Sequence, residues 1–138
     1  MNIITFGAHD VELPNLDWEA VRLWLCRVAE GYGKRIDTVN YMFVSDEEIL
    51  RVNRQFIGHD YYTDHIGFDY SQSDTLSGDT YISLDTVRTN AQLFHKTYDD
   101  ELLRVIVHSI LHLCGLNDKT PSERLLMEQA EDKALALR

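Results

Sequence analysis

Apolar residues recur along the chain with two different spacings, and the change from one to the other predicts the first elements. Residues 2–6 and 37–45 are rich in strand-forming residues. In the second segment Val39, Tyr41 and Phe43 alternate with other residues, as in a strand with one buried face. Residues 15–33 carry apolar side chains at helical spacing and end in glycines. The pattern therefore predicts a strand, an amphipathic helix and a second strand.

The middle of the chain predicts shorter elements around a long polar loop. Ser45 and Glu48 have the spacing of a capping box, so we expect a helix that runs to about residue 55. Strands are expected over 66–70 and 79–84, and a helix over 86–97 with Asp85 as its cap. The polar, aromatic segment before the first of these strands is long for a compact domain, and such loops are usually functional.

The C-terminal third predicts two more helices. The segment after Asp99 is apolar nearly all round, which is typical of a central, buried helix. Thr120, Pro121 and Glu123 form a helix start of the capping-box kind. The whole order predicts an α+β fold in which a small mixed four-stranded sheet packs with about five helices. We expect one domain over residues 1–138, with a metal site at the end of the central helix.

Composition narrows the class of protein. Apolar residues make up 44% of the chain and charged residues 26%, as in an ordinary globular domain. The start has no basic, apolar leader, and no run reaches the roughly 18 apolar residues of a membrane span. We therefore expect a cytoplasmic protein without a membrane partner. Cys26 and Cys114 share no CxxC spacing, so neither a disulfide scaffold nor a zinc ribbon is indicated.

The formal net charge of −10 argues against a nucleic-acid coat, since such proteins usually present a basic face. An enzyme that binds a few nucleotides is still compatible with it. A divalent cation and a few arginines can make a positive cleft in an acidic molecule. If RNA is the substrate, we expect cations from the set Arg54, Arg88, Lys96 and Arg104 to line the cleft.

The stretch HSILHLCGLND, residues 108–118, carries the most specific chemistry. Four residues of helix turn through about 400° and rise about 6 Å, so His108 and His112 point to the same place. Gly115 allows the chain to reverse and bring Asp118 back to them as a third ligand, whereas Cys114 lies on another side. Zinc takes three such ligands at a catalytic site and leaves one position open. The alternative is a pair of histidines on the polar strip of a buried helix, hydrogen-bonded to backbone or water.

Ser109 argues against one class of metal enzyme, the metallopeptidases. Metallopeptidases with the H-E-x-x-H motif place a glutamate base directly after the first histidine. Serine cannot accept a proton from water in that role, so a peptidase of this kind is disfavoured.

The same stretch resembles the motif H-G-x-L-H-L-x-G-Y-D-H of the YbeY-like metal-dependent endoribonucleases, with Asp118 in place of the last histidine. Residues 52–68 resemble the family's L-N-x-x-Y-R-x-x-D-x-x-T-D-V-L-S-F, and residues 78–83 its G-D-I-x-I-S strand. Order and spacing agree over residues 40 to 120. Ile57 stands where the family motif has an arginine associated with RNA binding or catalysis, and Arg54 or Arg88 are candidates to replace it.

The resemblance implies a zinc-dependent, single-strand-specific endoribonuclease with one Zn²⁺ per chain. It also implies a role in ribosomal RNA processing, namely 3′ end maturation of the small-subunit rRNA and ribosome quality control, with the ribosome or its associated factors as partners. Two alternatives are a non-catalytic ribosome assembly factor stabilised by its metal and a metal-dependent hydrolase of small molecules. The residues by themselves reach only a metal hydrolase.

Other polar residues are weaker candidates. Arg104 and Asp60 are the catalytic candidates, and Arg54, His59 and Arg88 the substrate-binding ones, because they lie on the histidine face, in the polar loop or near it. Each of them is also compatible with an ordinary solvated surface. His65 belongs to no recognised motif, and the last helix carries no catalytic signal.

Overall fold

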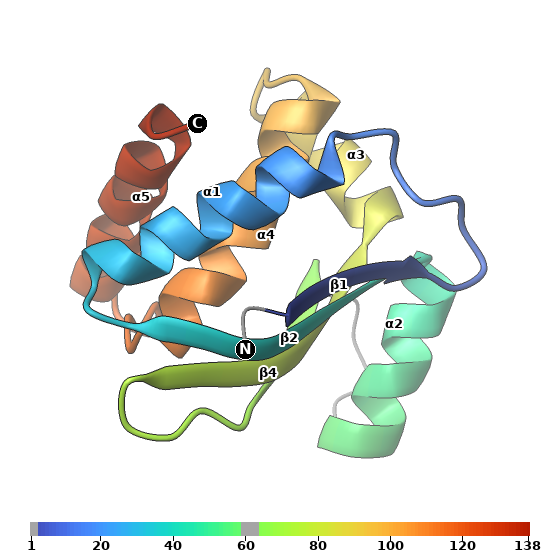
Figure 1. The fold of residues 1–138 in the computed structure, drawn as a ribbon. Coiled ribbons are helices and arrows are strands. Elements are labelled where there is room, and N and C mark those ends of the chain that lie inside the picture. The colour runs from blue at the N-terminus through green and yellow to red at the C-terminus, as the bar shows by residue number, and fades with distance from the viewer. Residues whose placement is uncertain (1–2, 59–63) are drawn as a thin grey trace.

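In the computed structural model, residues 3–58 and 64–138 are described, and they form a four-stranded mixed sheet with five α-helices (Figure 1). The strands are β1 (Ile3–Ala8), β2 (Arg35–Val44), β3 (His65–Asp69) and β4 (Thr75–Ser83). The α-helices are α1 (Trp18–Gly31), α2 (Asp46–Val52), α3 (Leu84–Leu93), α4 (Tyr98–Leu113) and α5 (Pro121–Ala136), and a π-helical turn, η1 (Asn53–Ile57), continues α2. The predicted fold class is confirmed.

The sheet has the strand order β1-β2-β4-β3, with β3 at one edge. Strands β1, β2 and β4 are parallel, whereas β3 runs antiparallel to β4. Gly78 of β4 permits a close approach of this edge strand, because a Cβ atom there would lie 2.6 Å from the backbone oxygen of Phe68. The glycine thus helps to fix β3, which contributes to the site.

The two faces of the sheet are covered unequally. Alternation along β2 places Val39, Tyr41 and Phe43 in the main core, which they share with α1, α4 and α5. Met42 and Val44 point the other way, into a smaller cluster that α2 covers. Figure 1 shows α1, α4 and α5 on one side of the sheet and α2 on the other.

Helix α4 is central, as its apolar sequence predicts, and most of it from Glu101 to Leu111 is buried. It is held to the sheet by two polar contacts in the core. The Tyr41 hydroxyl donates a hydrogen bond of 2.7 Å to the backbone oxygen of Ile106 and accepts one of 2.9 Å from Ser109. Ser109 therefore anchors the helix at the position where a metallopeptidase would carry its base.

The end of α4 turns the chain back on itself. Gly115 has φ +105°, a conformation that favours glycine, and Leu116 donates a backbone hydrogen bond of 3.1 Å to Leu111. The reversal leads to Thr120, which begins α5 with the predicted capping box. In the part of the chain that the structure describes, no helix is both long and apolar enough to cross a membrane.

One predicted helix has different ends from those expected. Helix α3 begins at Leu84 with Ser83 as its N-cap, so Asp85 is not the cap. The strand leads directly into the helix, and the Ser83 hydroxyl accepts the Thr86 N–H at 3.3 Å. The helix ends at Leu93, since His95 has φ +56°, and Thr97 caps α4 instead of closing α3.

Candidate metal centre

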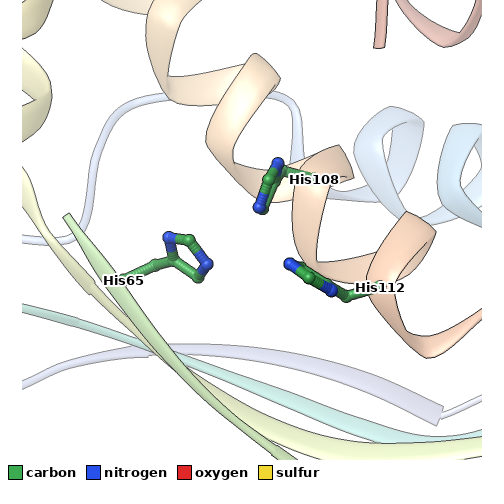
Figure 2. A group of neighbouring side chains, drawn as sticks. All are labelled: His65, His108 and His112. Carbon is green, nitrogen blue, oxygen red and sulfur yellow. The ribbon is translucent and has the colours of Figure 1, made fainter. Parts of the chain in front are cut away.

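Three histidines from two elements converge beside the end of α4 (Figure 2). His108 and His112 lie one turn apart on the helix, with ring centroids 4.7 Å apart. His65 comes from edge strand β3, where alternation turns Ile66 into the cluster under α2 and His65 towards α4. Its ring centroid lies 4.7 Å from that of His108 and 6.3 Å from that of His112.

Asp118 reaches the same point after the reversal at Gly115. Its Oδ2 atom lies 3.2 Å from His108 Nε2 and 3.3 Å from His112 Nε2. Ligand atoms placed tetrahedrally at about 2.0–2.1 Å from zinc are separated by about 3.3 Å. The spacing of Asp118 from both histidines is thus the spacing of a zinc ligand set.

The chemistry of His108 fits a cation at this point. Its Nδ1 atom lies 2.6 Å from Glu131 Oε2, and since a carboxylate only accepts, Nδ1 carries a proton, so that in the neutral ring Nε2 presents a lone pair. His108 Nε2 is the buried side-chain nitrogen or oxygen that lacks a hydrogen-bond partner in the described chain. Buried polar atoms without a partner are rare in folded proteins, and a bound cation would give this lone pair its partner.

Two overlapping sets of side chains could hold the metal. The donor atoms of His65, His108 and His112 lie within 4.8 Å of one another. Asp118 lies closer to both helix histidines, at 3.2 and 3.3 Å. We favour Asp118 as the third ligand because these two distances already suit coordination without movement.

Helix α5 supplies a residue that the sequence analysis did not identify. Glu131 is only 6% exposed and, besides His108, accepts a hydrogen bond of 2.8 Å from Arg104. A ligating histidine usually gives its second ring N–H to such a carboxylate, which fixes the ring and its tautomer. A signal was present, since Glu131 lies in the buried stripe of α5 with Met127, Ala130 and Ala134.

Burial and the charges of neighbouring residues shift the pKa values of the site residues, in some cases in opposite directions. Burial by itself would lower the pKa of His108, but the hydrogen bond and charge of Glu131, with the charge of Asp118, raise it overall. Burial and then the neighbouring His108 lower the pKa of His112. Burial would raise the pKa of Asp64, but its hydrogen bond with His65 and the charges of His65 and His108 hold it below its ordinary value. The carboxylates around His108 thus favour positive charge at this point, which a bound cation can also supply, whereas the surroundings of His112 disfavour its protonation.

Two cavities adjoin the histidines. The larger, about 480 Å³, is lined by His65, His108 and Asp118 and extends to Phe94, Lys96 and Arg124. The smaller, about 320 Å³, includes His65, His112 and Asn117 in its lining. The site therefore opens onto a cleft with polar and apolar walls.

The fold places some of the predicted cations in the larger cavity and others outside its lining. Lys96 and Arg104 line the larger cavity, as expected, and Arg124 joins them without having been predicted. The Arg104 guanidinium forms ion pairs with Glu131 and Asp132, with nitrogen–oxygen distances of 2.8 and 2.6 Å. Arg88 is exposed, pairs with Asp85 at 3.8 Å and lies over the Tyr98 ring.

The remaining candidates lie elsewhere or outside the described part of the chain. Arg54 is an exposed residue of η1. His59 and Asp60 lie outside the described residues. Cys114 ends α4 and packs against the main core, and burial raises the pKa of its thiol to about 11. A thiol that stays protonated is a poor zinc ligand, which agrees with its predicted packing role.

Comparison with known proteins identifies the family. The sequence profile of the family described as Endoribonuclease YbeY matches residues 5–137. A protein of that name from Bacteroides thetaiotaomicron is 57% identical over 135 residues, which cover 98% of this chain and 98% of that protein. A protein of the same name from Parabacteroides distasonis is 55% identical to this chain over 134 residues, which cover 97% of this chain and 94% of that protein.

A solved structure agrees with these relatives. The solution structure of TM1509 from Thermotoga maritima is similar with a TM-score of 0.71 and 28% identity, covering 98% of this chain and 88% of that one. The chain therefore belongs to the endoribonuclease YbeY family, which confirms both the resemblance of its motifs and the expectation of a hydrolytic enzyme.

Proposed function

We propose that the protein is a metal-dependent endoribonuclease that cleaves single-stranded RNA during ribosomal RNA processing. The observation that carries the proposal is the convergence of His108, His112 and Asp118 at the buried Nε2 atom of His108, which has no hydrogen-bond partner among the described residues. Membership of the endoribonuclease YbeY family supplies the reaction class.

His108, His112 and Asp118 would hold one divalent ion per chain, and two imidazoles with one carboxylate are a donor set that suits zinc. Such an ion would polarise the phosphodiester and make water a better nucleophile near neutral pH. Glu131 holds His108 in the ligating tautomer through its contact with Nδ1. Arg104 in turn fixes Glu131, so its part is to position the ligand system and not to meet the phosphate.

The larger cavity suits an unpaired RNA strand. Phe94, one of its lining residues, is 55% exposed and offers a flat apolar surface on which a base can stack. Lys96 and Arg124 are exposed cations in the same lining and can approach phosphates. An acidic chain with a few cations in one cleft predicts weak, site-limited RNA binding in place of a general affinity for nucleic acid.

The biological substrate that we propose is ribosomal RNA, with cleavage that matures the 3′ end of the small-subunit rRNA and contributes to ribosome quality control. This part rests on the family to which the chain belongs. The partners are then the ribosome and factors bound to it.

The deciding experiment measures cleavage of matched single-stranded and duplex RNA by the purified protein. Activity should disappear after chelation, return with zinc and favour the single strand. Asp118→Ala should remain inactive after zinc is added, while Asp74→Ala, at an exposed surface carboxylate, should behave like the parent protein. Zinc uptake without cleavage would indicate a metal-stabilised assembly factor, and cleavage of small phosphodiesters alone would indicate a small-molecule hydrolase.

The cations of the cavity can be tested separately. Neutralising Lys96 and Arg124 together by glutamine should weaken RNA binding and reduce its salt dependence by a log–log slope of about 1.4, since each contact with a single strand contributes about 0.7. Arg27→Gln, on the exposed surface of α1, is the matched control. An unchanged salt slope in the double variant would remove these two residues from the RNA path.

A further inference from the structure

His65 enters the site but has no part in the ligand set favoured above. Its Nδ1 atom lies 2.8 Å from Asp64 Oδ1, so the adjacent carboxylate fixes the ring. The Asp64 backbone oxygen accepts a hydrogen bond of 2.9 Å from Ser83, which holds that carboxylate at the edge of the sheet. Figure 2 shows a ring nitrogen of His65 turned towards the two histidines of α4.

We propose that His65 is a further catalytic residue, whose Nε2 atom accepts a hydrogen bond from the water molecule in the position that His108, His112 and Asp118 leave open. The inference rests on the metal-dependent function proposed above. It adds a direct contact to the reacting group. The three ligands bind the metal and do not make this contact.

The distances at the site allow His65 this role while Asp118 serves as the third ligand. A ligand must lie about 3.3 Å from the other ligands of a tetrahedral zinc. The donor atoms of His65, His108 and His112 lie within 4.8 Å of one another, and Asp118 contacts the two helix histidines at 3.2 and 3.3 Å. A group that hydrogen-bonds an exchangeable ligand lies one hydrogen bond, about 2.8 Å, beyond it, and the position of His65 beside both helix histidines is compatible with this contact.

The cavities give His65 access to the substrate path. Of the described residues, His65 is the one that lines both cavities, with His108 and Asp118 on one side and His112 on the other. His65 is therefore a wall that the two cavities share. Asp64 orients that imidazole as Glu131 orients His108, so each ring presents Nε2 to the same space.

His65 is also a departure of this chain from the motif that residues 52–68 resemble, in which valine stands at its position. The expected effect of its loss is a moderate reduction in rate, in contrast to the loss of activity expected from a missing ligand.

A crystal structure of the zinc-loaded, unmodified protein tests the contact directly. His65 Nε2 should lie about 2.7–3.2 Å from the non-protein ligand of zinc. A distance of about 2.0–2.1 Å between Nε2 and zinc would overturn the inference by making His65 a ligand. A ring turned out of hydrogen-bond reach would overturn it as well. Failure to take up zinc would instead overturn the proposed function, and this inference with it.

Variants test the same contact in solution. His65→Val and His65→Gln should keep zinc affinity within about threefold of the parent, because the ligands are intact, while kcat for RNA falls about tenfold or more and KM changes little. Partial rescue of kcat by glutamine, which retains a polar tip, would support the contact. His9→Val, at an exposed histidine of the loop after β1, is the control. A tenfold or greater loss of zinc affinity, or an unchanged kcat, contradicts the proposal.

Discussion

The two faces of α4 meet different kinds of partner. Towards the sheet, Ile106 and Ser109 lie against the buried Tyr41 hydroxyl, and the surrounding contacts are apolar. On the other face, His108 and His112 meet carboxylates from α5 and from the turn after Gly115. On the first face, the Ile106 carbonyl and the Ser109 hydroxyl have hydrogen-bond partners within the protein. The second leaves a buried nitrogen without a hydrogen-bond partner among the described residues and is therefore the face that can bind a ligand.

One helix therefore separates stability from metal binding by the sides on which its residues lie. Changes on the sheet face should alter the free energy of unfolding and leave zinc affinity near normal. Changes on the histidine face should do the reverse.

Loss of the third ligand should have the largest effect. Asp118→Ala is expected to weaken zinc binding by a factor of about 100 or more, because two imidazoles and water remain in place of three protein ligands. Asp118→His should restore binding, since imidazole is also a zinc ligand. Competition with a chromogenic chelator measures both affinities, and parent-like affinity in the alanine variant would exclude Asp118 from the ligand set.

Removal of the charge on Glu131 should have the next largest effect. Glu131→Gln keeps the shape of the side chain but weakens its hold on His108, and loss of such a partner typically costs 10–100-fold in metal affinity. Glu128→Gln, at an exposed residue of the same helix, is the matched control. Equal affinities in the two variants would show that Glu131 only pairs with Arg104.

A change on the sheet face of α4 should lower stability and leave zinc affinity near normal. Tyr41→Phe removes the hydroxyl that joins Ser109 to Ile106 and leaves buried polar groups unsatisfied, so the free energy of unfolding should fall by about 1–3 kcal/mol. Zinc affinity should stay near that of the parent. Chemical denaturation of the metal-free protein, combined with Ser109→Ala in a double-mutant cycle, isolates the coupling between the two hydroxyls. Additive losses would mean that the two groups do not cooperate.

Cys114 should show the smallest effect. Cys114→Ala removes a partly buried thiol that packs against the core, and the expected cost is about 1 kcal/mol of stability with zinc content unchanged. Metal analysis of the purified variant is sufficient. Zinc lost here but retained in Asp118→Ala would reverse the assignment of the third ligand.

The local features of this protein follow from its amino-acid sequence alone. Spacing of apolar residues gave the order of strands and helices, since each pattern follows from the geometry of one element. The four-residue spacing of His108 and His112 and the reversal at Gly115 likewise predicted that Asp118 would approach them, and the structure brings the three together. These relations lie within one short stretch, residues 108–118, over which backbone geometry alone sets distances.

Only the tertiary structure decided which distant residues meet this site. Glu131 reaches His108 because α5 packs on α4, and His65 does so because β3 pairs with β4 in one register, since a slip by one residue would turn it to the other face. The same packing pairs Arg104 with two carboxylates, a partnership that its place on the histidine face did not reveal. Such contacts depend on how whole elements pack, and no local pattern in the chain encodes their partners.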